Sequence, residues 1–210
     1  MSMRAALAAG AAILAVVAAG CGSSSSSSSS SKSGGQSTTK AASTPSPTTT
    51  PEASNPAGDI PDNQAYVAYS PPGAGYSVKV PEGWSRTATG GAVSFTDKLN
   101  TVRLEAVKAA SAPTVAGVRS AVVPRLAKTQ AGFKPGRVGT VHRTAGPAVR
   151  ITYLATGKAD PVTGKTRVDA VERYLFFHKG REAVLTLSGP KGADNVDPWR
   201  IITNSLRWTG

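Results

Sequence analysis

Apolar and polar residues alternate along most of the chain after residue 75, and this alternation limits the fold more than any other feature. In Gly75–Val80 apolar side chains occupy every second position, and the segment stops at a Pro-Glu-Gly turn, residues 81–83. Because successive side chains of a strand point to opposite faces, this period predicts strands. The period recurs at residues 93–95, 102–106, 137–143, 148–156, 167–178 and 182–188. The last four segments predict successive antiparallel strands separated by glycine-containing turns.

One helix is predicted between these two groups of strands. Its apolar residues recur with helical spacing at Val115, Val118, Val122 and Leu126. Thr114 is a suitable N-cap, and the helix is expected to end near Gly132. Pro124 removes one backbone hydrogen bond, so we expect a kink or an early break there.

A second helix is predicted to close the chain. Its expected buried stripe consists of Val196, Trp199, Ile202 and Leu206. Asp194 or Asp197 is the expected N-cap, and Pro198 suits the first turn. Strands, a helix, more strands and a final helix predict an α+β fold, an antiparallel β-sheet covered by helices.

The first 20 residues have the pattern of a bacterial export signal. One positive charge, Arg4, precedes an apolar run, Ala5–Ala19, that is too short to span a membrane permanently. The small residues before Cys21 resemble the lipobox of bacterial lipoproteins, so residues 1–20 are predicted to be a signal peptide and Cys21 to be acylated. Acyl chains would anchor the protein at the extracytoplasmic face of the cell membrane. The alternative is an ordinary secretory signal in which Cys21 is incidental.

A linker is predicted at residues 21–60, followed by one domain at residues 61–210. The linker consists mainly of Ser, Thr, Pro and Gly and has too few large apolar residues to fold. It is either a plain spacer or a carrier of O-linked sugar. The chain contains one cysteine, so its domain must be stabilised by a hydrophobic core and not by internal disulfides.

The charge of the chain predicts anionic partners. Lys and Arg number 24 against 12 Asp and Glu, a formal net charge of +12. Nucleic acid is the usual partner of such a charge, but export argues against it and leaves anionic lipid, acidic wall polymers or an envelope protein. The candidate residues for binding an anionic surface lie on predicted strands and are Arg103, Arg143, Arg150, Arg167 and Arg173. The alternative is a basic face that serves solubility alone.

Three tryptophans and two histidines are the remaining candidates for a site. Trp84, Trp199 and Trp208 either line an apolar groove or fill the core between sheet and helices. His142 and His178 lie on different predicted strands without cysteines or spaced carboxylates near them, so no metal site and no cofactor is predicted. No nucleophile with a matching base is recognisable, and the protein is therefore expected not to be an enzyme.

The segment Tyr76–Trp84 resembles the opening of PsbP-like domains, a hydrophobic strand followed by Pro-x-Gly-Trp, including those of LpqN- and LpqT-type actinobacterial lipoproteins. The closing half is also similar to that family, with two long strands at Tyr174–His178 and Ala183–Ser188, a loop at Pro190 and a terminal helix. The resemblance extends over nearly all of residues 66–208. It implies a sheet covered by helices, and a binding or assembly role without catalysis.

These observations lead to two main hypotheses. The first is a membrane-anchored envelope lipoprotein that binds an anionic envelope component or a partner protein through a basic face or groove. The second is a carrier that holds a lipid or a wall precursor in an apolar pocket. An envelope hydrolase or transferase is a third alternative, for which the nucleophile and base are lacking.

Overall fold

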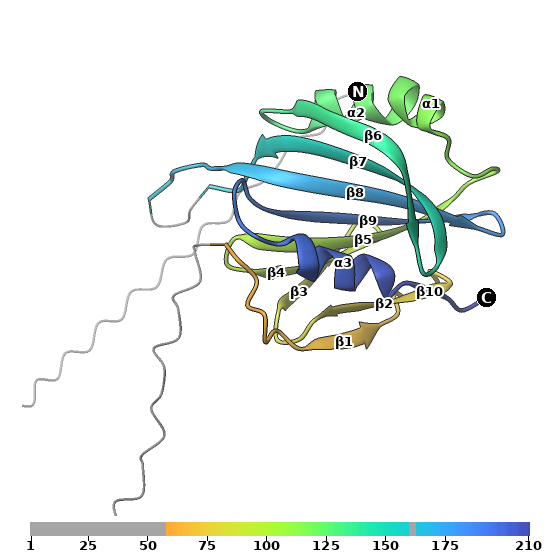
Figure 1. Ribbon diagram of the computed structural model, residues 1–210, viewed down its shortest axis with the longest axis horizontal. Helices are drawn as coiled ribbons and strands as arrows, with labels where there is room; N and C mark the ends of the chain where they lie inside the picture. The colour runs from red at the N-terminus through yellow and green to blue at the C-terminus, as the bar shows by residue number, and fades with distance from the viewer. Residues whose placement is uncertain (1–57, 160–162) are drawn as a thin grey trace, which may run out of the picture. The chain divides into compact units, whose positions relative to one another are not determined.

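The computed structural model describes residues 58–159 and 163–210 (Figure 1). The signal peptide predicted at residues 1–20, Cys21 and the linker up to residue 57 lie outside the described residues. Thr50–Gly210 forms one compact unit. Both hydrophobic core clusters of the described residues lie inside this unit, so it contains the core that an independently folding domain requires.

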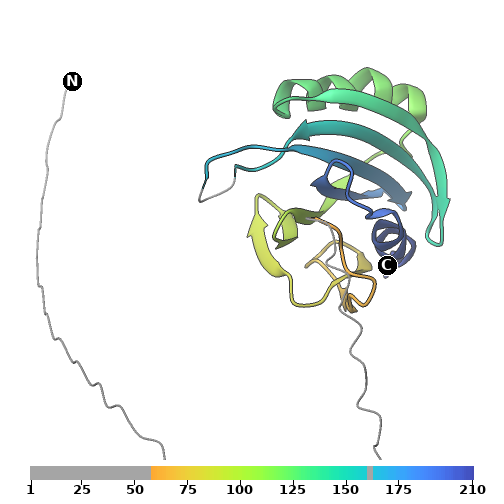
Figure 2. The same ribbon diagram turned by 60° about the vertical axis from the view of Figure 1, so that its left-hand side comes forward.

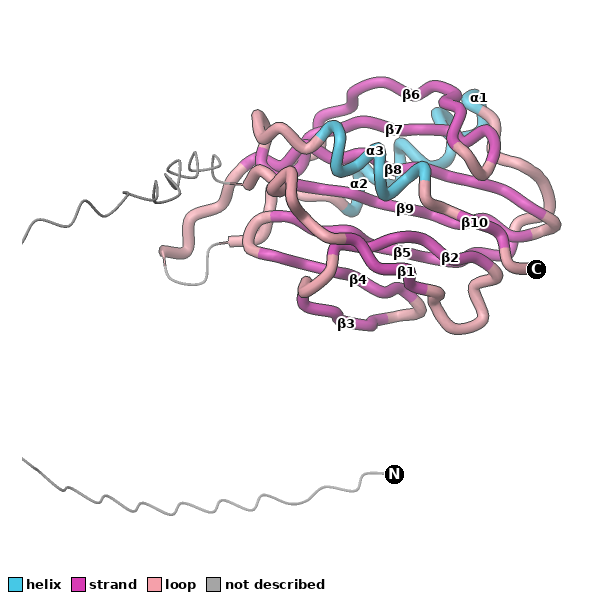
Figure 3. The backbone as a smooth tube through the Cα atoms, turned by 60° about the horizontal axis from the view of Figure 1, so that its bottom comes forward, coloured by secondary structure: helices cyan, strands magenta, loops and turns pink. Residues whose placement is uncertain are grey.

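Seven antiparallel strands form the main sheet, in the order β3-β4-β5-β9-β8-β7-β6 (Figure 3). Their bounds are Ser85–Thr89 (β3), Ala92–Asp97 (β4), Asn100–Lys108 (β5), Lys134–Arg143 (β6), Gly146–Thr156 (β7), Val168–His178 (β8) and Arg181–Pro190 (β9). The four successive strands predicted in the second half are confirmed as β6 to β9. The predicted α+β class, an antiparallel sheet with helices on it, is confirmed as well.

A smaller sheet joins the two ends of the domain. It contains β1 (Tyr66–Tyr69), β2 (Tyr76–Pro81) and β10 (Arg207–Trp208), in the order β1-β2-β10. Only β2 was predicted from the sequence. Tyr76, Val78 and Val80 of β2 are buried in the larger core cluster together with Leu104, Leu185 and Ile202, so this small sheet closes one face of the main sheet.

The helices lie on opposite faces of the main sheet, as Figure 2 shows. One face carries α1 (Val115–Gly117), η1 (Val118–Val122) and α2 (Val123–Thr129), which run consecutively. The other face carries α3 (Val196–Asn204). Two separate core clusters follow from this arrangement, one under each group of helices.

The first helical segment is broken by a π-helical turn, η1, which directly precedes α2, the helix whose second residue is Pro124. Thr114 caps it as predicted, because its Oγ1 accepts a hydrogen bond from the Gly117 backbone N–H at 3.0 Å. Pro124 lies in the first turn of α2 and has no N–H to continue a regular ladder, which explains the interruption. The helix ends at Thr129, slightly before the expected end at Gly132.

The start of α3 differs from the prediction. Neither Asp194 nor Asp197 is the N-cap; that position is held by Asn195, whose side chain makes no capping hydrogen bond. Val196 is 69% exposed and does not belong to the buried stripe, although Trp199, Ile202 and Leu206 are buried as expected.

Asn195 connects the start of the domain to the sheet. Its Oδ1 accepts a hydrogen bond from the Ile60 backbone N–H at 2.8 Å, and its Nδ2 donates to Gly58 O and to Asn100 Oδ1, both at 3.0 Å. Gly189 lies against this cluster, where a side chain would collide with Asn100 and Asn195. The amide is therefore used for a buried tertiary network and not for the helix cap.

Candidate functional site

The face of the main sheet that carries α1, η1 and α2 is only partly covered by these helices. Beneath them, Val149, Ile151 and Leu175 pack in the smaller core cluster with Val118 and Leu126. Beyond the helices, the same face is polar where it crosses β5, β9 and the adjoining part of β8. Arg103, Thr186 and Arg173 are register partners across these three strands, so their side chains project from one face.

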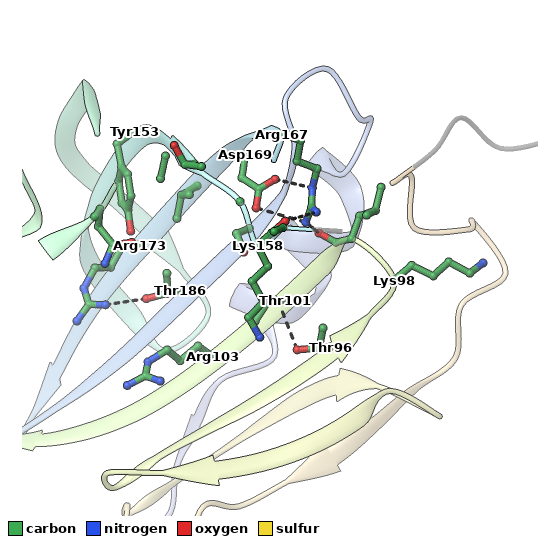
Figure 4. A pocket seen from close by; sticks show the side chains of 18 residues that line it. Thr96, Lys98, Thr101, Arg103, Tyr153, Lys158, Arg167, Asp169, Arg173 and Thr186 are labelled. Carbon is green, nitrogen blue, oxygen red and sulfur yellow. Dashed lines mark hydrogen bonds and ion pairs between the residues drawn. The ribbon is translucent and has the colours of Figure 1, made fainter. Parts of the chain in front are cut away.

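A pocket of about 620 Å³ lies over this polar half of the face (Figure 4). We call it the arginine pocket. Its lining includes Lys98, Arg103, Tyr153, Lys158, Arg167, Asp169, Val171, Arg173 and Thr186. They come from β5, β7, β8, β9 and the adjoining loops, so the pocket is built by residues that are far apart in the sequence.

Two arginines of the pocket share one carboxylate. Arg103 Nη2 lies 3.2 Å from Glu105 Oε1, and Arg173 Nη2 lies 3.2 Å from Glu105 Oε2. Arg173 also donates from Nη1 to Thr186 Oγ1 at 2.8 Å. The three charged side chains are 40%, 21% and 23% exposed for Arg103, Arg173 and Glu105, so the two guanidinium groups are fixed in place while part of their surface remains accessible.

Arg167 is held at the other end of the pocket. Its Nε lies 2.8 Å from Asp169 Oδ1, and its Nη2 donates to the Leu99 carbonyl oxygen at 2.8 Å. Figure 4 shows this ion pair near the loop that carries Lys98, away from Arg103 and Arg173. The contact between Arg167 and Leu99 ties the start of β8 to the turn between β4 and β5.

The pocket has an excess of positive charge. Five cationic side chains, Lys98, Arg103, Lys158, Arg167 and Arg173, stand against the carboxylates of Glu105 and Asp169. Within residues 58–159 and 163–210, neither lysine makes an ion pair. Among the described residues, an anion entering the pocket would therefore meet more positive than negative charge.

Burial changes the acid–base behaviour of two groups in the pocket. It raises the pKa of the Asp169 carboxyl above its ordinary value, although the neighbouring Arg167 opposes that change. It also raises the pKa of the Tyr153 hydroxyl, again against the effect of a cation, Arg173. Tyr153 therefore remains protonated at neutral pH and keeps a hydroxyl hydrogen available for donation.

The arrangement suits an anionic group attached to an apolar part. Guanidinium groups offer paired donors to phosphate or carboxylate oxygens, and Thr186 adds a hydroxyl close to Arg173. Tyr153 and Val171, buried for most of their surface, form an apolar wall beside these cations.

The five arginines predicted as a basic face do not lie together. Arg103, Arg167 and Arg173 meet in the arginine pocket, whereas Arg143 and Arg150 lie on the opposite face of the sheet near α3. All five are half-buried and hydrogen-bonded, so none points freely into solvent as the strand pattern suggested. The reason is that neighbouring side chains and carbonyl groups accept hydrogen bonds from each guanidinium group.

The tryptophans fill the core or pack against it, which was one of the two alternatives considered for them. Trp199 is 9% exposed and belongs to the larger core cluster, and Trp84 and Trp208 pack against that cluster with part of their surface exposed. They do not meet in a common groove: Trp199 borders a hollow near α3, and Trp208 stacks on His178 with ring centroids 5.3 Å apart.

Sequence reasoning did not find Glu105, Lys98, Lys158 or Thr186. Arg103 and Glu105 are two residues apart on one strand and therefore share a face, which is a usable signal. The loop lysines give no such signal, because only the tertiary fold brings them to the pocket.

Neither a metal cluster nor a spanning helix is found in the part of the chain that the structure describes. No group of three or more His, Cys, Asp or Glu side chains gathers there. No helix among these residues is both long and apolar enough to cross a membrane.

The sequence matches no family model and no curated protein. Among solved structures, the fold is similar to cyanobacterial PsbP (CyanoP) from Synechocystis, with 14% identity over 69% of this chain and 93% of that chain and a TM-score of 0.49. LpqN of Mycobacterium tuberculosis, described as involved in cell envelope biogenesis, has 15% identity over 71% and 93% of the two chains and a TM-score of 0.40. A protein of Bacteroides thetaiotaomicron has 14% identity over 67% of this chain and a TM-score of 0.45; the match spans 47% of that protein.

Proposed function

We propose that this protein is a non-enzymatic binding module of the bacterial envelope, anchored by lipid on Cys21, that holds an anionic envelope component in the arginine pocket. The observation that carries the proposal is the excess of fixed cations in that pocket, above all Arg103 and Arg173, which share the single carboxylate of Glu105. The export signal and Cys21, taken from the sequence, support the location.

The ligand class follows from the chemistry of the lining. Phosphate or carboxylate oxygens match the guanidinium groups of Arg103 and Arg173, and an adjoining apolar part would rest on Tyr153 and Val171. An anionic lipid headgroup and an acidic wall polymer both present such oxygens. Each cation near an anionic membrane adds about 1 kcal/mol of attraction, so several cations together give a measurable affinity.

Vesicle flotation tests the proposal. The unit Thr50–Gly210, which contains both core clusters, is mixed with vesicles of phosphatidylcholine alone or with phosphatidylglycerol, at low and at high salt. A parallel arm adds soluble glycerol phosphate as competitor. Binding to the anionic vesicles that high salt or the competitor removes supports the proposal, and equal recovery with both vesicle types at low salt contradicts a lipid ligand. If a soluble acidic wall polymer also fails to bind, the pocket has no envelope ligand of the proposed class.

A small-ligand carrier is the second candidate. It is favoured by a hollow of about 560 Å³ at α2 and β6, whose lining includes Val123, Phe133, Val138 and Ile151. The backbone of β6 is irregular here, because its register with β7 shifts between Pro135 and Val138. Mass spectrometry of the purified full chain for co-purified lipid tests this candidate. A Phe133→Asp substitution would abolish such co-purification if the hollow holds the lipid.

A further inference from the structure

The face of the main sheet opposite the arginine pocket carries a separate group of arginines near the start of α3. A hollow of about 240 Å³ lies there, and its lining includes Arg143 of β6, Arg150 of β7, Glu172 and Tyr174 of β8 and Trp199 of α3. We call it the α3 hollow. Because Arg150 and Tyr174 are register partners on β7 and β8, these side chains project into it from one face of the sheet.

Arg143 is fixed in this hollow by neutral groups. Its Nε donates to Thr203 Oγ1 at 3.0 Å, its Nη1 to the His142 carbonyl oxygen at 3.0 Å and its Nη2 to the Tyr174 hydroxyl at 3.2 Å. The guanidinium carbon also lies 5.3 Å from the centroid of the Tyr174 ring. An arginine held in this way has already lost its rotamer freedom, so an anion that binds it does not bear that entropic cost.

Arg143 has no carboxylate partner among the described residues, even though it is half-buried. The one acidic side chain that lines the hollow, Glu172, is already engaged: Arg150 Nη1 lies 3.2 Å from its Oε1, and the Tyr174 hydroxyl donates to its Oε2 at 2.5 Å. Of the three arginines that line the hollow, Arg150 is paired with Glu172 and Arg200 with Asp197, which leaves Arg143 without a carboxylate in contact in the described part of the chain. A positive charge that is partly removed from water and lacks a counter-charge is stabilised by an anion.

We infer that the α3 hollow binds a small oxyanion, a phosphate or a terminal carboxylate group, between Arg143 and Arg150. The fork of donors on a guanidinium matches the oxygens of either group, and the volume of about 240 Å³ is sufficient for such a group. Trp199 forms the apolar side of the site. This site lies on the other face of the sheet from the arginine pocket, so it does not depend on the function proposed for that pocket.

A purely structural role for Arg143 would be to join β6 to α3 through Thr203. A structural arginine would stabilise the fold and show no saturable response to anions. The two roles therefore differ in a binding measurement and not in stability alone.

Nuclear magnetic resonance on the unit Thr50–Gly210 provides that measurement. The chain has three tryptophans, so its indole N–H signals are few, and the Trp199 signal is assigned by its loss in Trp199→Phe. The protein is titrated with inorganic phosphate, and separately with acetate, against chloride at constant ionic strength. We expect a saturable shift of the Trp199 signal, and the tighter of the two anions identifies the group that the site takes. A shift that only grows linearly with either anion would overturn the inference.

Three variants assign the binding to the site. Arg143→Gln should weaken it about tenfold or more, whereas Arg125→Gln removes the same charge from an exposed position on α2 and should leave it unchanged. Glu172→Gln should tighten it, because the carboxylate that competes for Arg150 is gone. A gain in affinity cannot result from damage to the fold. Unchanged affinity in both Arg143→Gln and Glu172→Gln would contradict the site.

Discussion

Arg173 on β8 reaches across β9 to Glu105 on β5, with 3.2 Å between its Nη2 and Glu105 Oε2. Because Arg103 lies at the same distance from the other oxygen, Oε1, one carboxylate holds two guanidinium groups on the polar half of the sheet. The carboxylate positions these cations and at the same time neutralises only part of their charge. Because part of the positive charge of Arg103 and Arg173 remains, the pair can bind an anion, as the proposed function requires.

Glu105→Gln separates these two effects. The substitution removes the shared carboxylate, so the unfolding free energy should fall by about 1 kcal/mol, a modest loss because all three side chains retain contact with water. Binding of anionic vesicles should become stronger, since Arg103 and Arg173 lose their internal competitor. Urea denaturation and flotation measure the two quantities. Weaker vesicle binding in a folded Glu105→Gln protein would show that the carboxylate does not compete with a ligand.

Gly189→Ala should destabilise the domain by about 2–3 kcal/mol. A Cβ at this position would lie 2.3 Å from Asn100 Oδ1 and 2.9 Å from Asn195 Nδ2, and it would break the buried amide network that fixes the start of α3. Gly139→Ala on β6 is the matched control, because a Cβ there has no neighbour within 4 Å. Equal midpoints of urea denaturation for the two variants would contradict the importance of this network.

We expect the ionisation of the Tyr76 hydroxyl to lower the free energy of unfolding in alkaline solution. Burial raises the pKa of its hydroxyl above the ordinary value, and the charge of Glu105 adds to the effect. The folded state therefore keeps a proton that the unfolded chain releases near pH 10, so the contribution is complete below about pH 10 and is lost as pH rises further. Tyr76→Phe should reduce the slope of unfolding free energy against pH in this range. Identical slopes for the two proteins would show that Tyr76 titrates equally in both states.

The period-two pattern was sufficient to predict the long strands, because β5, β7, β8 and β9 bury one or both faces and β6 half-buries Val138 and Val141. It could not reveal β3, whose five residues, Ser85–Thr89, are all exposed at the edge of the sheet and so show no apolar alternation. The two-residue strand β10 is too short for any periodicity and exists because Trp208 pairs with Tyr76 of β2. Edge and terminal strands of this kind depend on their partners.

The chemistry of the candidate site could be predicted from the sequence, but the positions of its residues in the fold could not. Arg103, Arg167 and Arg173 were expected as anion-binding residues, and the strand period alone places Arg103 and Glu105 on one face. The separation of Arg143 and Arg150 to the opposite face depends on the register of β7 against β8, where Arg150 pairs with Tyr174, and on the turns that set it. The cap of α3 was mispredicted for a related reason, because Asn195 serves a network with Asn100 that is distant in sequence.

The comparison of Arg173→Gln with Arg125→Gln in the vesicle assay shows whether the arginine pocket itself binds the anionic surface. Both variants remove one positive charge, but only Arg173 lies in the arginine pocket, whereas Arg125 is exposed on α2. We expect Arg173→Gln to lower the affinity for phosphatidylglycerol vesicles about tenfold, and Arg125→Gln to change it by less than about twofold. An equal loss in both variants would show that net charge, and not the pocket, attracts the anionic surface.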